Sequence, residues 1–217
     1  MARIGDPGVL FRNVNTPADL EGLDAIVLPG GESTTLGLVA EGSGLLDALR
    51  DTLNDQLALD VQNIELVSLL PELGAALSTD ALPSHAHQAI QAIEQADFLI
   101  VGSPIFRAGI PGLLKHLFDL VDMNALNGTP VLLAATGGSQ RHALVIEHQL
   151  RPLFSFFQSL TLPIGVYATP EEIQDGEVTS SALQQHIQRT VDLAVPVLHS
   201  IQARLPLQNT VLEAQAA

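Results

Sequence analysis

The sequence predicts an α/β protein in which a doubly wound parallel sheet carries helices on both faces. Short apolar runs of β-like composition alternate along the chain with longer segments of helical periodicity. Three of these runs lead directly into a loop that contains glycine or proline, and a helix-like segment follows each loop. This strict βαβα order implies right-handed crossovers, and ligands of such folds bind beyond the carboxyl ends of the strands.

The first half of the chain contains two predicted strands and one long predicted helix. Residues 24–29 form a mainly apolar run that leads into two glycines, which is typical of a buried strand. A helix should follow over residues 34–53, with a candidate break at 42–44, where two glycines occur. Residues 61–69 are the second β-like run, and a long loop is expected over residues 71–83.

The second half of the chain alternates between strands and helices more regularly. Leu113, Leu117 and Leu120, for example, fall on one stripe of a helix. The predicted helices span 84–95, 109–121, 142–157 and 180–203, and the predicted strands span 97–102, 129–135 and 162–167. All the runs together predict five strands, with residues 8–14 as a candidate extra N-terminal strand.

Composition excludes several classes of function. The 217 residues include 9 Lys and Arg against 24 Asp and Glu, a formal charge of −15, which disfavours binding to nucleic acid or to anionic lipid. The apolar runs are far shorter than the roughly 20 residues of a membrane-spanning helix. The chain has no cysteine, so disulfides, thiolate ligands and cysteine nucleophiles are excluded. We therefore expect a cytoplasmic protein that uses neither a membrane nor nucleic acid.

The loop after the first predicted strand has the chemistry of a phosphate site. Gly31 allows close backbone approach, and Ser33, Thr34 and Thr35 offer hydroxyl groups at the start of a helix. Glu32 opposes this interpretation, because a carboxylate repels a phosphate. The alternative is that the glycines form a turn and a hydroxyl caps the helix.

The loop after the strand at 97–102 offers a surface for a flat ring. Pro104 fixes the exit from the strand, and Ile105 and Phe106 form an apolar pair that either lies along a ring or belongs to the core. Arg107 is a cation at the expected rim, where it either meets an anionic ligand or faces solvent.

The loop after the strand at 129–135 exposes main-chain amides. Thr136, Gly137, Gly138 and Ser139 leave the N–H groups unobstructed, which suits hydrogen bonding to the edge of a heterocycle. The alternative is an ordinary strand-to-helix turn. Since all three loops follow parallel strands, they should converge on one pocket.

Neither the histidines nor the acidic clusters form a recognisable catalytic or metal site. His85 and His87 lie two residues apart at a predicted helix start, so they do not share a face, and we expect no metal site. Glu171 and Glu172, with the acidic residues of 175–177, are expected to form a solvated loop.

Residues 45–198 resemble the NADPH-dependent FMN reductase family, and in particular the flavin reductases of two-component alkanesulfonate or methanesulfinate monooxygenases. The segments that carry the resemblance are Val-Gly-Ser-Pro-Ile-Phe-Arg-Ala (101–108), Gly-Leu-Leu-Lys-His-Leu-Phe-Asp-Leu (112–120), Ala-Ala-Thr-Gly-Gly-Ser (134–139) and Glu-His-Gln-Leu-Arg-Pro (147–152).

This resemblance implies a flavodoxin-like fold and an enzyme that passes a hydride from NAD(P)H to FMN and supplies a partner monooxygenase. The FMN ring would lie against residues 104–107 and 136–139. Subunits would form a homodimer or homotetramer through the helix after the third loop, with His148 as a candidate interface residue.

Residues 19–35 instead resemble the glutaminase subunit of pyridoxal phosphate synthase, a class I glutamine amidotransferase. Glutaminase activity is excluded, because the nucleophilic cysteine and the His-Pro-Glu motif of that family are absent. The chain therefore has the pattern of a chimera, with an amidotransferase-like βα segment at 1–50, a reductase domain at 51–204 and a tail at 205–217.

The substituted segment also lacks the arginine of the reductase family's phosphate loop, so we expect weakened binding of the FMN phosphate. A catalytically silent flavodoxin-like scaffold is the alternative to a working reductase.

Overall fold

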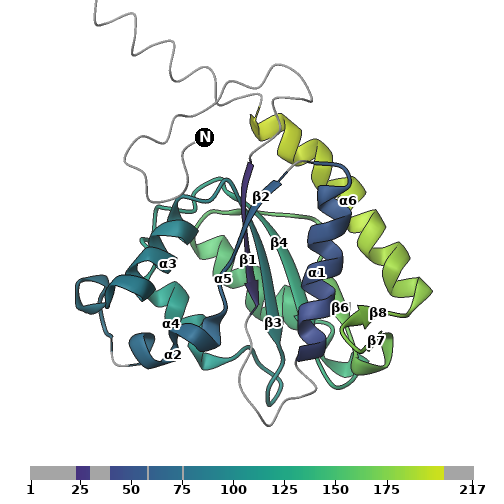
Figure 1. Cartoon of the computed structure of the whole chain (residues 1–217), viewed down its shortest axis with the longest axis horizontal. Helices are drawn as coiled ribbons and strands as arrows, with labels where there is room; N and C mark the ends of the chain where they lie inside the picture. The colour runs from purple at the N-terminus through teal and green to yellow at the C-terminus, as the bar shows by residue number, and fades with distance from the viewer. Residues whose placement is uncertain (1–22, 30–39, 58, 75, 203–217) are drawn as a thin grey trace, which may run out of the picture.

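The computed structural model describes residues 23–29, 40–57, 59–74 and 76–202. A parallel sheet forms the centre of the protein (Figure 1). Its strands follow the order β2-β1-β3-β4-β5, and a further short strand, β6, also pairs with β4. The strands are β1 (Leu23–Pro29), β2 (Leu59–Asn63), β3 (Phe98–Pro104), β4 (Pro130–Thr136), β5 (Leu160–Thr161) and β6 (Val166–Ala168). The expected doubly wound order is confirmed, and β5 and β6 together occupy the fifth position.

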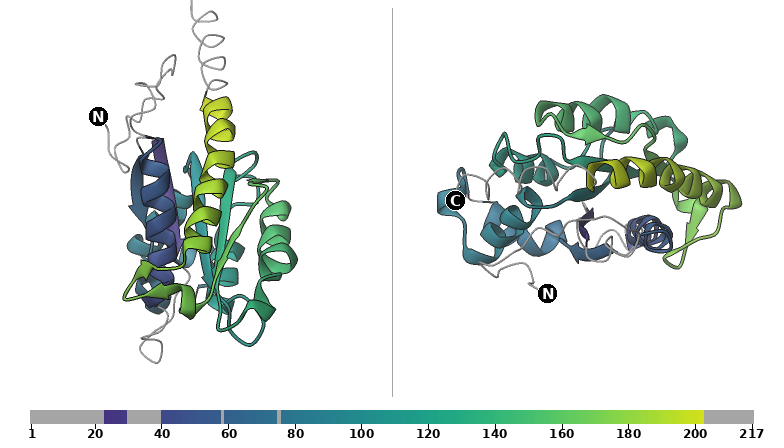
Figure 2. Two further views of the ribbon diagram at one scale, coloured as in Figure 1. Left: turned by 90° about the vertical axis from the view of Figure 1, so that its right-hand side faces the viewer. Right: turned by 90° about the horizontal axis from the view of Figure 1, so that it is seen from above.

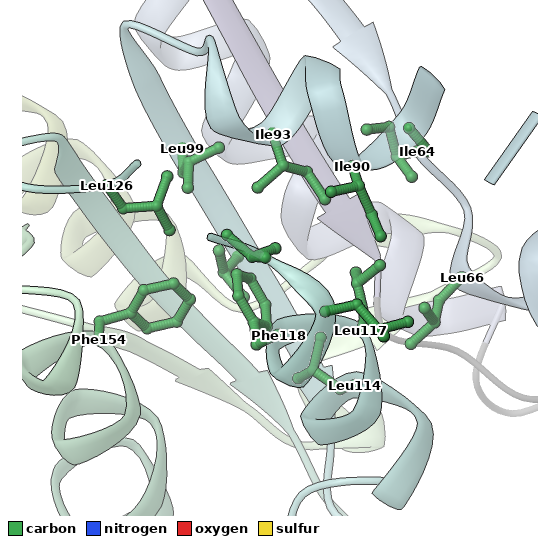
Figure 3. Packing of buried hydrophobic residues seen from close by; sticks show 14 of the residues in the cluster. Ile64, Leu66, Ile90, Ile93, Leu99, Leu114, Leu117, Phe118, Leu126 and Phe154 are labelled. Atoms are coloured by element: carbon green, nitrogen blue, oxygen red, sulfur yellow. The ribbon is translucent and has the colours of Figure 1, made fainter. Parts of the chain in front are cut away.

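Each face of the sheet is covered by its own group of helices and its own apolar cluster. Side chains alternate along β3, so that Leu99 and Val101 join one cluster and Phe98 and Ile100 join the other. The first cluster contains residues of α2 (Leu66–Leu73), α3 (Ser84–Glu94), α4 (Gly112–Leu120) and α5 (Arg151–Phe156) (Figure 3). The second contains residues of α1 (Ala40–Asn54) and α6 (Ser181–Gln202), which pack side by side (Figure 2).

The structure differs from the sequence-based prediction over residues 61–83. The single strand predicted at 61–69 is wrong, since β2 ends at Asn63 and helix α2 begins at Leu66. Leu66, Leu69 and Leu73 are buried at helical spacing, which an apolar run also produces. The long loop predicted at 71–83 is shorter, because α2 continues through Pro71 and a 3₁₀ turn follows at Thr79–Ala81.

Three elements of the predicted architecture have a different form. Of the predicted strand at 162–167, only Val166 and Tyr167 lie in a strand, β6, because β5 already ends at Thr161. Pro163, which cannot donate to the sheet, lies in the gap between β5 and β6. The predicted helix at 142–157 is a 3₁₀ turn, a π-helical turn at Ile146–Leu150 and then α5. Helix α1 runs without a break through 42–44.

The acidic segment expected to be a solvated loop is a 3₁₀ turn at Pro170–Glu172 and a hairpin of β7 (Ile173–Gln174) and β8 (Glu177–Val178). The extra strand predicted at 8–14 and the tail at 205–217 lie outside the described residues.

The amidotransferase-like segment contributes β1, a strand inside the sheet. Leu23–Val27 pair with β2, and Ala25–Pro29 pair with β3, both in parallel. The division of the chain into domains near residue 50 stays a prediction. No helix in the described part of the chain has the length and apolarity to span a membrane.

Candidate functional site

The carboxyl ends of the central strands lie at one edge of the sheet. Pro104 of β3 is in register with Thr136 of β4, and Pro29 of β1 is in register with Gly102. The second and third predicted loops therefore start side by side, as expected. Gly31, Ser33, Thr34 and Thr35 lie outside the described residues, although the strand that precedes them ends at this edge.

The second loop is a tight and strained turn over residues 106–109, which we call the platform turn. The N–H of Phe106 donates to the carbonyl of Gly109 at 2.9 Å, and the N–H of Gly109 donates back at 3.0 Å. Arg107 and Ala108 both have positive φ angles, 50° and 67°. Each such non-glycine residue costs about 1–3 kcal/mol and persists only where its surroundings hold it.

The side chains of this loop differ in their surroundings. Pro104 is buried, and Ile105 packs against the first apolar cluster. Phe106 is half-buried and belongs to neither cluster, so part of its apolar surface is uncovered. Arg107 is exposed and makes no ion pair with another described residue. The loop thus offers an apolar surface beside a cation.

Gln149 holds the far side of the platform turn. Its Oε1 accepts a hydrogen bond from the N–H of Ile110 at 2.9 Å, and its Nε2 donates to the carbonyl of Ala108 at 3.1 Å. Sequence reasoning missed this role, because it treated the segment around Gln149 as a regular helix with an interface residue. His148, the candidate interface residue, is exposed in the same π-helical turn.

The third loop is attached to the strand beside it. The N–H of Gly137 donates to the carbonyl of Ala168 at 3.1 Å, and the hydroxyl of Tyr167 donates to the carbonyl of Ser139 at 2.7 Å. A Cβ atom at Gly137 would clash with the Tyr167 hydroxyl, whereas a Cβ atom at Gly138 would meet nothing within 4 Å. The loop is therefore packed at Gly137 and open at Gly138.

A hydrogen-bond network behind the third loop, part-buried at Thr169 and exposed at Gln140, includes the carboxylate of Glu172. It accepts hydrogen bonds from the N–H and hydroxyl of Thr169, at 2.9 and 3.0 Å, and from Nε2 of Gln140 at 3.3 Å. Burial, together with the negative charge of Glu172, raises the pKa of the Tyr167 phenol. Sequence analysis gave no role to Tyr167, although it is the last residue of the strand predicted at 162–167.

The geometry fits a flat heterocycle with acceptors on one edge. Within the described residues, the N–H groups of Gly138 and Ser139 have no hydrogen-bond partner, and Gly138 has open space beside it. Phe106 adds apolar surface from the neighbouring loop. In the same described ranges, His, Asp and Glu residues do not gather into a group that could hold a metal ion.

A parallel sheet of this order, in which β1, β3 and β4 end at one edge, defines the flavodoxin-like class. The solved structure of a short-chain flavodoxin associated with a bacterial microcompartment has the same fold, with a TM-score of 0.52 and 11% identity over 82% of this chain and 99% of that one. An oxidoreductase from Corynebacterium diphtheriae is more similar, with a TM-score of 0.72 and 30% identity over 83% of this chain and 98% of that one.

The chain belongs to the NADPH-dependent FMN reductase family, whose sequence profile matches residues 40–174. It is 56% identical over 153 residues to an NADH-dependent FMN reductase of Pseudomonas fluorescens, and 50% identical over 153 residues to an NADPH-dependent FMN reductase of Pseudomonas aeruginosa. Both matches cover 70% of this chain and 82% of the relative.

The N-terminal segment has a different relationship, as expected. The profile of the SNO glutamine amidotransferase family matches residues 3–61. The chain is 49% identical over 45 residues to the pyridoxal 5'-phosphate synthase subunit PdxT of Saccharolobus solfataricus, a match that covers 21% of this chain and 22% of that protein. The two profiles overlap over residues 40–61, which include α1 and the first residues of β2.

Proposed function

We propose that this protein is an NAD(P)H-dependent FMN reductase. The observation that carries the proposal is that the loops after β3 and β4 start side by side. They do so in a chain that belongs to the FMN reductase family. One loop offers an apolar surface with a cation, and the other offers open main-chain donors. This combination suits the ring of a flavin better than it suits a simple structural turn.

Each loop has a proposed role toward FMN. Residues 104–107 form the platform for the ring, with Phe106 as the uncovered apolar group and Arg107 as the cation. Thr136, Gly137, Gly138 and Ser139 line the ring edge, where the N–H groups of Gly138 and Ser139 donate to ring acceptors. Gly31, Ser33, Thr34 and Thr35 are the proposed phosphate cradle.

The protein's contribution to the reaction is binding and orientation. When bound, FMN supplies the chemistry, since its ring accepts a hydride from NAD(P)H. The residues of the two loops would hold the ring and orient it toward the nicotinamide. No side-chain nucleophile or base is required of them.

We also propose the partners and setting that the resemblance implies. Reduced FMN would pass to a flavin-dependent monooxygenase, and the protein would work in the cytoplasm, where NAD(P)H is produced. The π-helical turn with the exposed His148 is the proposed contact surface of a homodimer or homotetramer.

The decisive experiment is anaerobic oxidation of NADH and of NADPH with added FMN, followed by the loss of absorbance of the reduced nucleotide. A folded sample should oxidise at least one nucleotide in proportion to enzyme concentration, and only when flavin is present. A rate no higher than that of buffer would overturn the proposal. If flavin fluorescence also showed no quenching on titration with protein, the silent scaffold would be the correct description.

A further inference from the structure

We propose that Gln149 is a positioning residue that keeps the platform turn in the shape that receives the flavin. The inference rests on the proposed function, since it assigns the purpose of the turn to FMN binding. It goes beyond that function by assigning a role to a residue that lies outside the three ligand loops.

The platform turn needs support from outside its own sequence. Arg107 and Ala108 adopt the left-handed conformation without being glycine, and only two hydrogen bonds close the turn itself. Phe106 directly precedes these two residues, so a relaxation of either φ angle would move its ring. The position of the platform therefore depends on whatever holds the turn.

A single glutamine amide meets this need, because it has a donor and an acceptor in one plane. Nε2 donates to the carbonyl of Ala108, and Oε1 accepts from the N–H of Ile110. The two bonds lie on either side of Gly109, where a Cβ atom would be 3.3 Å from Oε1 of Gln149. The absence of a side chain at Gly109 leaves room for the amide.

The amide is attached to a fixed support. Gln149 lies in the π-helical turn, whose Ile146 and Leu150 side chains are buried in the first apolar cluster. Arg151, the first residue after this turn, donates to the carbonyl of Leu162 at 2.9 Å and forms an ion pair with Glu147 at 2.6 Å. The π-helical turn is thus held by the core on one side and holds the platform turn on the other.

The test compares Gln149→Met with a matched control, Gln188→Met. Methionine has nearly the shape of glutamine and makes neither hydrogen bond. Gln188 is exposed on α6, against the opposite face of the sheet, and its amide donates to Asp192 at 2.8 Å. We expect Gln149→Met to weaken the Kd and the KM for FMN by about tenfold, with a near-native circular dichroism spectrum, and the control to change neither.

A second pair of variants separates positioning from a general loss of structure. Ala108→Gly removes the steric cost of the left-handed conformation, so adding it to Gln149→Met should recover part of the lost FMN affinity. If Gln149→Met does not fold, Gln149→Glu decides instead, because it keeps an acceptor for Ile110 and loses the donor to Ala108. Weaker FMN binding by this folded variant supports the inference.

The outcomes distinguish the inference from the proposed function. Wild-type affinity in folded Gln149→Met, or in Gln149→Glu where methionine prevents folding, overturns the role of Gln149 and leaves the reductase activity standing. Equal weakening in the Gln188 control, or no recovery with Ala108→Gly, also overturns it. A folded wild type that neither binds nor reduces FMN defeats the proposed function, and the inference with it.

Discussion

The hydroxyl of Tyr167 donates a 2.7 Å hydrogen bond to the main-chain carbonyl of Ser139. With the bond from Gly137 to Ala168, it fastens the third loop to β6 at two points, and the bond from Gln140 to Glu172 adds a third just beyond the loop. A loop held in this way is preorganised, so ligand binding does not have to order it.

Tyr167 should titrate at a higher pH in the folded protein than in the unfolded chain. Burial, assisted by the charge of Glu172, raises its pKa. Because the folded value is the higher one, the stability gained from the neutral phenol is complete below about pH 10, the unfolded value, and is lost as pH rises through the folded pKa. Tyr167 is the only tyrosine and the chain has no tryptophan, so the ultraviolet absorbance of tyrosinate reports this one group.

Tyr167→Phe is the matched variant for this titration. It should lose about 1 kcal/mol of unfolding free energy near neutral pH, because the hydrogen bond to Ser139 is removed, and it should lose the alkaline decline that Tyr167 causes. Urea denaturation at several pH values measures both effects. A native tyrosinate signal at the same pH as in denaturant would contradict the burial of this hydroxyl.

Gly137→Ala and Gly138→Ala should affect the protein in different ways. The added methyl group at Gly137 clashes with the Tyr167 hydroxyl and lies 3.4 Å from Cβ of Ile105, so we expect a loss of about 1–3 kcal/mol in unfolding free energy. At Gly138 the methyl group has open space, and stability should stay within about 0.5 kcal/mol of wild type.

FMN affinity is a second property in which Gly138→Ala should differ from wild type. Gly138→Ala places a methyl group where the ring edge is proposed to lie, so FMN affinity should fall although the fold is unchanged. Isothermal denaturation and a flavin fluorescence titration on both proteins provide the measurement. Normal FMN affinity in Gly138→Ala would place the ring elsewhere.

The periodicity of apolar residues predicted the strands and helices whose buried positions follow a regular pattern. Strand β3 is buried at every residue and α4 buries one stripe, so residue patterns alone located both. The same method failed at residues 61–69, because a short apolar run fits a strand and a buried helix turn equally well. It also could not detect the π-helical turn, whose extra residue leaves the buried positions Ile146 and Leu150 at an ordinary helical spacing.

The candidate site was predictable where it depends on strand order. Parallel strands bring their carboxyl ends to one edge, so Pro104 and Thr136 were expected to meet, and they are in register. The supporting contacts of Gln149 and Tyr167 were not predictable, because they join residues 41 and 28 positions apart through side-chain geometry. Sequence spacing contains no signal for such bonds.

Substitution of Gly44 tests how closely α1 packs against the β7–β8 hairpin. A Cβ atom there would clash with the carbonyl oxygen of Gly176, at the tip of the β7–β8 hairpin. Since the obstacle is backbone, Gly44→Ala should cost about 1–3 kcal/mol of unfolding free energy. Gly112→Ala is the control, because a Cβ at this first residue of α4 meets nothing within 4 Å. Thermal denaturation that showed equal stability for both variants would mean that the hairpin does not pack against α1.

Glu32→Arg should tighten FMN binding. Residue 32 lies outside the described residues, but β1 ends at Pro29 beside Gly102, so the loop that follows starts at the edge of the sheet where the other two loops lie. The substitution removes a negative charge near the proposed phosphate position and adds a positive one. We expect the Kd for FMN to fall several-fold, up to about tenfold, at low ionic strength, with a smaller gain at high salt.

Two controls isolate the phosphate as the cause. Asp55→Arg changes the net charge by the same amount, but Asp55 is exposed and follows α1, at the opposite edge of the sheet, so FMN affinity should not change. Riboflavin has the same ring and no phosphate, so its affinity should be equal in wild type and Glu32→Arg. Tighter binding of both flavins would indicate a ring contact, and unchanged binding of both would mean that this loop does not reach the ligand. Only a gain confined to FMN agrees with a phosphate cradle built from the amidotransferase-like segment, because only FMN brings to that loop a charge that the arginine can neutralise.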